Sequence, residues 1–137
     1  MKDFSVRQAA ALLGVSDDTV RRWGESGRVV LAKGANGRTT IAGTDLVDVL
    51  RESAAASALA DEFQTVRSSS RNKLTGLVIR IERDGVMAQV DIQAGPFRVV
   101  SLMSREAVDD LGLEVGMLAT ASVKATTVSV ELPAGDT

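Results

Sequence analysis

Val86-Met87-Ala88-Gln89-Val90-Asp91-Ile92-Gln93 is a stretch in which apolar residues recur at every second position. Side chains along a β-strand point to opposite faces in turn, so this spacing predicts a strand with one buried face. The buried face would carry Val86, Ala88, Val90 and Ile92. The other face would carry Met87, Gln89, Asp91 and Gln93. Such a strand needs partners, which we expect in the flanking sequence.

The flanking sequence predicts four more strands and one helix. The strands are expected at residues 74–83, 97–102, 117–124 and 128–132. Asp84-Gly85 and Ala94-Gly95-Pro96 supply the turns around the central strand. The helix is expected after Ser104, which would be its N-cap, and Gly112 would end it. Five short strands with a helix between the third and the fourth are the order of an OB-type barrel.

The N-terminal part of the chain predicts two short helices. Ser5 is a good N-cap for the first helix, and Gln8 stands three residues later, as a capping box requires. Gly14 would end this helix, and Ser16 would cap a second one that runs to about Gly24. Two helices joined by a short turn with a glycine form a helix-turn-helix. We expect a small core of Ala9, Leu12, Leu13, Val15, Val20 and Trp23.

A hairpin and a further helix should follow. Residues 29–32 and 39–41 are β-prone runs on either side of Asn36-Gly37, which is a hairpin turn signal. Thr44 is the expected cap of an apolar-periodic helix. These elements predict an α+β chain: a winged helix-turn-helix over residues 1–52, a helical connector over 53–68 and a five-stranded barrel over 69–137.

Composition excludes most enzyme chemistry. The 137 residues include no Cys and no His, which removes disulfides, Cys/His metal sites, thiol nucleophiles and imidazole bases. We therefore expect a binding protein rather than an enzyme, with no direct bond between the protein and a metal ion. The sequence shows no secretory signal and no apolar run long enough to cross a membrane, so we expect a cytoplasmic protein.

Positive charge gathers in one N-terminal region although the whole chain has a net charge of −2. A helix of a helix-turn-helix fits the major groove of DNA, where arginine can donate two hydrogen bonds to guanine. Arg21 and Arg22 are adjacent on the second helix, so one would meet a base edge and the other a phosphate. The candidate DNA-binding residues are Asp18, Thr19, Arg21, Arg22, Arg28, Lys33 and Arg38. The simpler interpretation is a pair of surface helices with solvated arginines.

The N-terminal motif resembles a known class of regulators. Phe4-Ser5-Val6-Arg7-Gln8-Ala9-Ala10-Ala11-Leu12-Leu13-Gly14-Val15-Ser16, followed by Thr19-Val20-Arg21-Arg22-Trp23, is similar to the winged helix-turn-helix of MerR-type and excisionase-type proteins. Residues 36–41 resemble the wing of that family. The resemblance covers roughly residues 4–50 and implies DNA as a partner.

Three motifs in the C-terminal part resemble the Mop/TOBE domain, the molbindin fold. They are Ser69-Ser70-Arg71-Asn72-Lys73-Leu74-Thr75-Gly76, residues 104–113, and Val123-Lys124-Ala125-Thr126-Thr127-Val128. The resemblance implies binding of molybdate or tungstate between subunits, in a dimer at least or a hexamer built as a trimer of dimers. By motif position, the oxyanion-binding residues would be Ser69, Arg71, Ser104, Ala107, Lys124 and Ala125. The family often has serine at the position of Ala107.

The chemistry of these residues fits an oxyanion. A tetrahedral dianion offers only acceptor oxygens, so its site must consist of cations, hydroxyls and backbone N–H groups. The alternative is that Arg71 and Lys124 are ordinary surface charges and Ser104 is only an N-cap. Our hypothesis is a molybdate- or tungstate-responsive transcription regulator. The alternatives are an oxyanion storage protein and a ligand-free multimeric DNA-binding protein.

Overall fold

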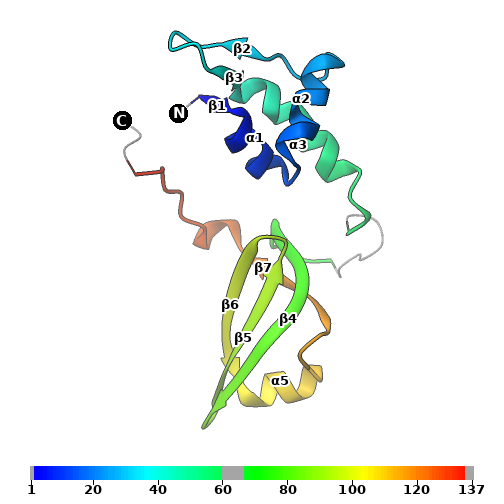
Figure 1. Ribbon diagram of the computed structural model, residues 1–137. Coiled ribbons are helices and arrows are strands. Elements are labelled where there is room, and N and C mark those ends of the chain that lie inside the picture. The colour runs from blue at the N-terminus through cyan, green and yellow to red at the C-terminus, as the bar shows by residue number, and fades with distance from the viewer. Residues whose placement is uncertain (1, 60–66, 135–137) are drawn as a thin grey trace. The chain divides into compact units, whose positions relative to one another are not determined.

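The chain folds into two compact units in the computed structural model, which describes residues 2–59 and 67–134. The first unit comprises residues 1–61 and 133–137, and the second comprises residues 62–132 (Figure 1). Both units combine helices with antiparallel sheet, so the α+β class predicted from the sequence is confirmed. Within the described ranges, no helix has the length and the apolar character that crossing a membrane requires.

The first unit holds three helices and three short strands. In chain order these are β1 Asp3–Ser5, α1 Val6–Leu13, α2 Asp17–Glu25, β2 Ala32–Lys33, β3 Thr39–Ala42 and α3 Gly43–Ala55. The three strands form one antiparallel sheet in the order β1-β3-β2. The pairing of β1 with β3 was absent from the sequence prediction, because a three-residue strand is too short to show periodicity.

Local capping chemistry sets the ends of α1 and α2. The hydroxyl of Ser5 accepts a hydrogen bond from the Gln8 amide at 3.1 Å, and the Gln8 side chain accepts one from the Ser5 amide at 3.0 Å. Gly14 ends α1 with φ of 70°, a left-handed conformation that glycine adopts without steric cost. Ser16 caps α2 by accepting from the Thr19 amide at 3.1 Å. The predicted capping box and both predicted N-caps are confirmed.

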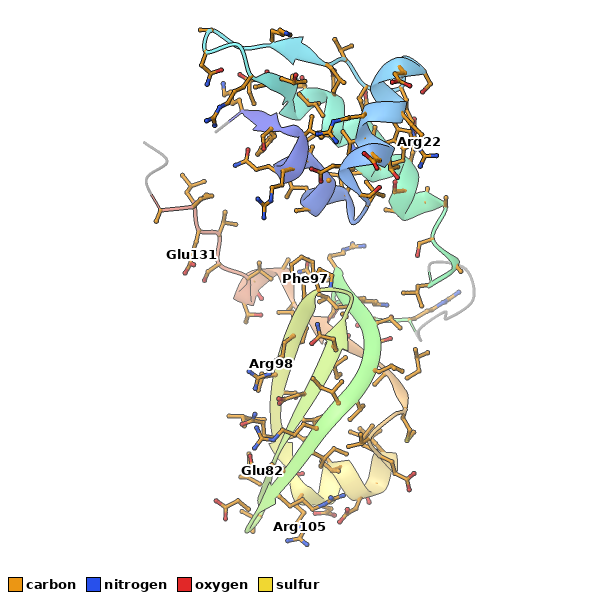
Figure 2. All side chains as sticks on the ribbon, in the orientation of Figure 1. Arg22, Glu82, Phe97, Arg98, Arg105 and Glu131 are labelled. Atoms are coloured by element: carbon orange, nitrogen blue, oxygen red, sulfur yellow. The ribbon has the colours of Figure 1, made fainter. Side chains whose placement is uncertain are left out.

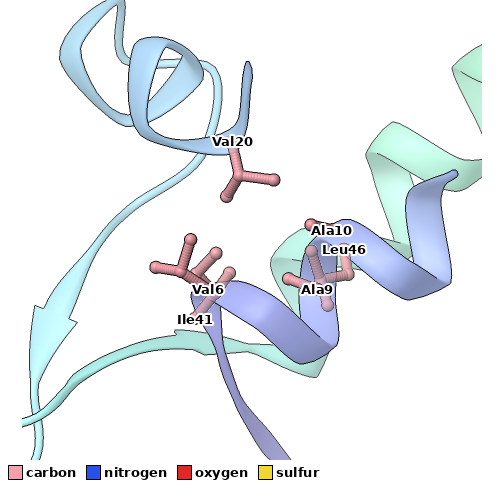
Figure 3. Packing of buried hydrophobic residues seen from close by; sticks show 6 residues of the cluster. All are labelled: Val6, Ala9, Ala10, Val20, Ile41 and Leu46. Atoms are coloured by element: carbon pink, nitrogen blue, oxygen red, sulfur yellow. The ribbon is translucent and has the colours of Figure 1, made fainter. Parts of the chain in front are cut away.

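A small apolar cluster holds the first unit together. Its buried members are Val6, Ala9, Ala10, Val20, Ile41 and Leu46 (Figure 3). They come from α1, α2, β3 and α3, so burying them fixes the angle between the two N-terminal helices. Leu13 and Val15 pack against this cluster, as predicted, and Trp23 is half-buried. Leu12 was predicted wrongly as a core residue, because its side of α1 faces solvent and it is 53% exposed.

Two further predictions for this unit were wrong. Thr44 does not cap α3, because the helix begins at Gly43, directly after β3. Its N-cap is Ala42, two residues before the predicted cap, and this residue makes no side-chain hydrogen bond. The Gly43 amide instead donates to the backbone carbonyl of Lys2 at 2.6 Å. The first hairpin strand is shorter than predicted, because only Ala32 and Lys33 pair with β3.

The second unit is a four-stranded antiparallel sheet with one short helix. Its elements are β4 Asn72–Asp84, β5 Met87–Ala94, β6 Phe97–Ser104, α5 Arg105–Leu111, β7 Leu118–Val123 and a 3-10 turn at Ala125–Thr127. The strand order is β6-β5-β4-β7. β4 is the long curved strand of Figure 1, and it pairs with β7 through its first half and with β5 through its second half.

The alternation in the central strand places the core on one face. Ala88, Val90 and Ile92 are buried with Val78 of β4 and Val108 of α5, as the spacing predicted. Val86 was predicted wrongly to join them, because it lies in the turn after Gly85 and is 81% exposed. The predicted N-cap Ser104 is confirmed by its hydrogen bond from the Ala107 amide, and Gly112 ends α5 in the left-handed conformation.

The predicted fifth strand does not form within one chain. Residues 128–132 follow the 3-10 turn and make no strand pairing with the described residues, so the closed five-stranded barrel becomes a four-stranded curved sheet. The pattern of Val128, Val130 and Leu132 is that of a strand, but strand hydrogen bonds need a neighbour. The 3-10 turn leads the chain away from β7 before it could pair there (Figure 1).

Gly76 allows the sheet to close tightly where β4 passes from one partner to the other. A side-chain carbon at this position would overlap the backbone carbonyl of Gln93 on β5. A backbone group is less able to yield than a side chain, so glycine is needed for this close approach. Gly76 is the last residue of the motif that begins at Ser69. The end of this motif is therefore part of the tightly packed region of the sheet.

Asp91 is a buried carboxylate on the face of β5 that was predicted to be polar and exposed. It is 2% exposed, and its Oδ2 accepts from Arg98 Nε at 3.0 Å and lies 2.8 Å from Arg98 Nη2. Its Oδ1 accepts from Gln89 Nε2 at 2.9 Å. The Gln89 hydrogen bond, aided by the Arg98 charge, outweighs burial and holds the pKa of Asp91 below its ordinary value.

We expect Asp91→Asn to lower the melting temperature at pH 7. The difference in melting temperature between the variant and the unmodified protein should become smaller as the pH falls below about 4. A depressed pKa stabilises the folded state above the pKa of the unfolded chain, and this gain is lost when acid protonates the folded carboxylate. Thermal unfolding of both proteins from pH 7 to pH 3 measures this, with exposed Asp110→Asn as the control. An equal deficit at every pH would contradict the argument.

Candidate oxyanion site and nucleic-acid interface

One end of the four-stranded sheet brings two predicted cations together. Asn72 of β4 pairs with Val123 of β7, and its side-chain amide donates to the Val123 carbonyl at 3.0 Å. Arg71 and Lys124 are the next residues outward on these two antiparallel chains. Both side chains are exposed. Two like charges held on adjacent chain ends attract an anion between them.

The same end of the sheet holds two more predicted ligands. Ser69 lies two residues before Arg71 and is exposed. Ala125 begins the 3-10 turn, in which the Lys124 carbonyl accepts from the Thr127 amide at 3.0 Å and from the Thr127 hydroxyl at 2.8 Å. Ser69, Arg71, Lys124 and Ala125 thus form one group, which we call the cationic half-site.

The other two predicted ligands lie at the opposite end of the sheet. Ser104 pairs with Met87, which pairs in turn with Asp84 at the far end of β4. The Ser104 hydroxyl accepts from the Ala107 amide at 3.1 Å, so these two candidate positions bond to each other. We call Ser104 and Ala107 the hydroxyl half-site. In Figure 2, Arg105 marks this end of the sheet and Phe97 lies toward the other.

The two half-sites therefore lie far apart within a single chain. β4 runs from Asn72 to Asp84, and at about 3.3 Å per residue this spans roughly 40 Å of strand. The surface hollow beside Ser104 is also lined by Glu106, Asp109 and Asp110, whose charges oppose an anion, with Arg105 as the one cation in its lining. The six predicted oxyanion-binding residues do not meet within one copy of the chain.

The candidate DNA-reading residues share the exposed side of α2. Arg21 forms an ion pair with Asp18 at 3.5 Å, and Arg22 donates to the Thr19 hydroxyl at 3.1 Å. Both contacts link residues three apart along the helix, which places the partners on the same face. Arg22 points outward from α2 in Figure 2. Asp18 and Thr19 are thus the nearest polar partners of the two arginines on this helix.

The hairpin presents two further basic candidates, Lys33 and Arg38. Lys33 pairs with Thr39 at the base of the turn, and both Lys33 and Arg38 are exposed. The turn is fixed by backbone hydrogen bonds from Gly34 to the Arg38 carbonyl at 2.7 Å and from Gly37 to the Gly34 carbonyl at 2.9 Å. The Arg38 amide donates to the Asn36 side chain at 3.0 Å. These contacts give the hairpin tip a defined shape.

Arg28, also a candidate DNA-binding residue, contacts two residues of the first unit. Its guanidinium lies 4.3 Å from the centre of the Trp23 ring and 3.4 Å from a Glu52 carboxylate oxygen. Trp23 belongs to α2 and Glu52 to α3, so Arg28 links these two helices. The sequence analysis missed Glu52, because the pair is separated by 24 positions and no local pattern joins them.

Comparison with known proteins identifies the second unit. The model of the TOBE domain family matches residues 68–130. A probable molybdenum-pterin-binding protein of Haemophilus influenzae is 46% identical over 66 residues, which are 47% of this chain and 96% of that protein. Molybdenum-pterin-binding protein 3 of Clostridium pasteurianum is 36% identical over 63 residues, which are 45% of this chain and 93% of that protein.

A solved structure also matches this part of the chain. It is a molybdate binding protein from Sporomusa ovata with 34% sequence identity and a TM-score of 0.47, and the match covers 49% of this chain and 100% of that one. On sequence, the second unit is a TOBE domain. The chain thus belongs to the TOBE domain family. The family match does not include the first unit.

Arg28→Ala should lower the free energy of unfolding of the first unit by about 0.5–1 kcal/mol, which is typical of an exposed cation–π contact. It should also change the fluorescence of Trp23, the only tryptophan of the chain. Urea titration followed by tryptophan emission measures both effects, and Arg38→Ala serves as a control with no contact to the ring. Identical emission spectra in Arg28→Ala and the unmodified protein would contradict the stacking.

Proposed function

We propose that the protein is a molybdate- or tungstate-binding transcription regulator of the cytoplasm. The second unit binds the oxyanion, and the first unit binds DNA. The observation that carries the first half is the position of Arg71 and Lys124 beside the last strand pair of a TOBE domain. The names of two bacterial relatives refer to molybdenum, which supports a ligand that contains this element.

The donor set suits a tetrahedral dianion. Arginine, lysine and serine hydroxyls donate hydrogen bonds to oxygen acceptors, and hydrogen bonds to a charged group are stronger than neutral ones. Arg71 can offer two parallel N–H donors, and Lys124 adds a second positive charge. Ala107 has no hydroxyl at a position where the family often has one, and its amide already donates to the Ser104 hydroxyl. Because the anion carries its own oxygens, no bond between a side chain and the metal atom is needed.

A complete site requires two chains. The cationic half-site and the hydroxyl half-site lie at opposite ends of one sheet, so the hydroxyl half-site must come from a second copy. A dimer is the smallest assembly that satisfies this requirement, and a trimer of dimers satisfies it as well. Binding between chains also gives the ligand a way to change the spacing of two DNA-binding units.

DNA binding rests on the exposed face of α2 and on the adjacent hairpin. Arg21 and Arg22 are exposed on this face, where their guanidinium groups can reach a base edge or a phosphate. Lys33 and Arg38 lie on a turn with a fixed backbone, where they suit phosphate or minor-groove contacts. Arg28, a further candidate for contact with DNA, also links α2 to α3.

Arg71→Ala and Lys124→Ala should each weaken molybdate binding at least tenfold, because one hydrogen bond to a charged ligand is worth about 1.5–3 kcal/mol. Isothermal titration calorimetry with molybdate, tungstate and sulfate measures the affinity and the number of ions per chain. Arg38→Ala, in the first unit, is the matched control and should bind like the unmodified protein. The oxyanion proposal would be contradicted if neither molybdate nor tungstate gave a heat of binding or raised the melting temperature.

Arg21→Ala or Arg22→Ala should weaken the binding free energy for DNA by about 1–3 kcal/mol. The duplex used is one that the protein selects from a random DNA pool. The variant that loses a base contact should also relax sequence preference at one position, whereas loss of a phosphate contact should weaken all duplexes alike. Arg71→Ala in the absence of molybdate is the control. If the protein enriches no sequence, the DNA half is wrong and a storage protein remains. If duplex affinity is equal with and without molybdate, regulation by the anion is wrong.

A further inference from the structure

The two cations of the cationic half-site stand opposite each other on two antiparallel chains. Asn72 and Val123 are the last partners of β4 and β7, and continuing their register places Arg71 opposite Lys124. Like charges that are directly opposite on neighbouring strands repel each other and destabilise the pairing. Among the described residues, neither cation has an ion-pair partner that would offset this repulsion. Other contacts must therefore hold the two chain ends at their spacing.

The side chain of Asn72 links the two chains directly next to these cations. Its Nδ2 donates to the Val123 carbonyl at 3.0 Å, although the two residues are 51 positions apart in the sequence. Asn72 is half-buried, and a hydrogen bond gains strength where water is partly excluded. On the other side of Lys124, the Thr127 hydroxyl donates to the Lys124 carbonyl at 2.8 Å. The backbone is thus held on both sides of Lys124, and Asn72 supplies the link toward Arg71.

We propose that Asn72 is a positioning residue that sets the spacing of Arg71 and Lys124, and thereby the size of the anion that the site accepts. This inference rests on the proposed oxyanion function and names the basis of its selectivity. Asn72 acts through the backbone and makes no contact with the anion. Two cations at a held spacing bind best the ion whose oxygens span that spacing, because no free energy is spent on ordering the chains when the ion binds. A smaller ion cannot reach both cations at once.

A purely structural role for Asn72 predicts a different result. The hydroxyls of Thr75 and Thr120 form a second side-chain hydrogen bond between β4 and β7, with 2.8 Å between the oxygens. Thr75 is three residues further from the cations and is also half-buried. If Asn72 only stabilised the strand pairing, loss of either hydrogen bond would have the same effect. If Asn72 sets the spacing, only its loss changes how the site treats anions of different size.

Asn72→Leu tests the assignment, because it removes the donor and keeps a side chain of similar size. Calorimetry gives the affinity for molybdate, and the affinity for sulfate, the smaller anion, is measured by competition against molybdate. We expect molybdate binding to weaken roughly two- to tenfold, since the ion must then order two chains that one hydrogen bond ordered before. Sulfate affinity should not fall, so the ratio of the molybdate affinity to the sulfate affinity should fall by the same factor.

Thr75→Val is the matched control on the same pair of strands. It should lower the melting temperature, because a cross-strand hydrogen bond is lost, and it should leave the ratio of the two affinities unchanged. Light scattering should give both variants the oligomeric mass of the unmodified protein. Asn72→Ala has less bulk to accommodate beside β7, and it repeats the measurement if Asn72→Leu does not fold.

The outcomes separate this inference from the function on which it rests. An unchanged affinity ratio in Asn72→Leu, or an equal fall in Thr75→Val, overturns the assignment and leaves oxyanion binding intact. A smaller oligomeric mass for Asn72→Leu than for Thr75→Val also overturns it, because the side chain would then act on assembly. If the unmodified protein binds neither molybdate nor tungstate, the oxyanion function fails and the assignment of Asn72 fails with it.

Discussion

The backbone pairing of β4 is the constraint on which the second unit depends. Thirteen residues long, this strand pairs with β7 over residues 72–77 and with β5 over residues 77–84. Gly76 lies at the changeover, where a side chain would overlap the β5 backbone. One strand thus defines both ends of the sheet, and each end positions a different group of the candidate oxyanion-binding residues. The separation of Arg71 from Ser104 is a direct result of the length of β4.

Features that depend on neighbouring residues could be predicted from the sequence. Ser5, Ser16 and Ser104 cap helices as expected, since a cap needs only the next three residues. The alternation from Ala88 to Ile92 identified the buried face for the same reason. The position of Gly14 was equally readable, because a glycine after an apolar helix pattern is a strong local stop.

Features that depend on distant partners could not be predicted. Asp91 looked like an exposed residue of a polar face, and only the fold brings Arg98 and Gln89 around it. The alternating pattern of residues 128–132 was recognised, but strand propensity does not reveal whether a neighbour lies in the same chain. For the candidate site, the motifs supplied the residues, whereas their division between two ends of the sheet required the strand pairing.

A site divided between two chains has a consequence for how the protein would respond to its ligand. Mass action makes the population of such a site depend on the amount of protein as well as on the amount of anion. The threshold for the anion would then fall as the protein becomes more abundant, and dilution alone would release the ligand. A cell could adjust the proposed response through the level of expression, without altering any residue of the proposed site.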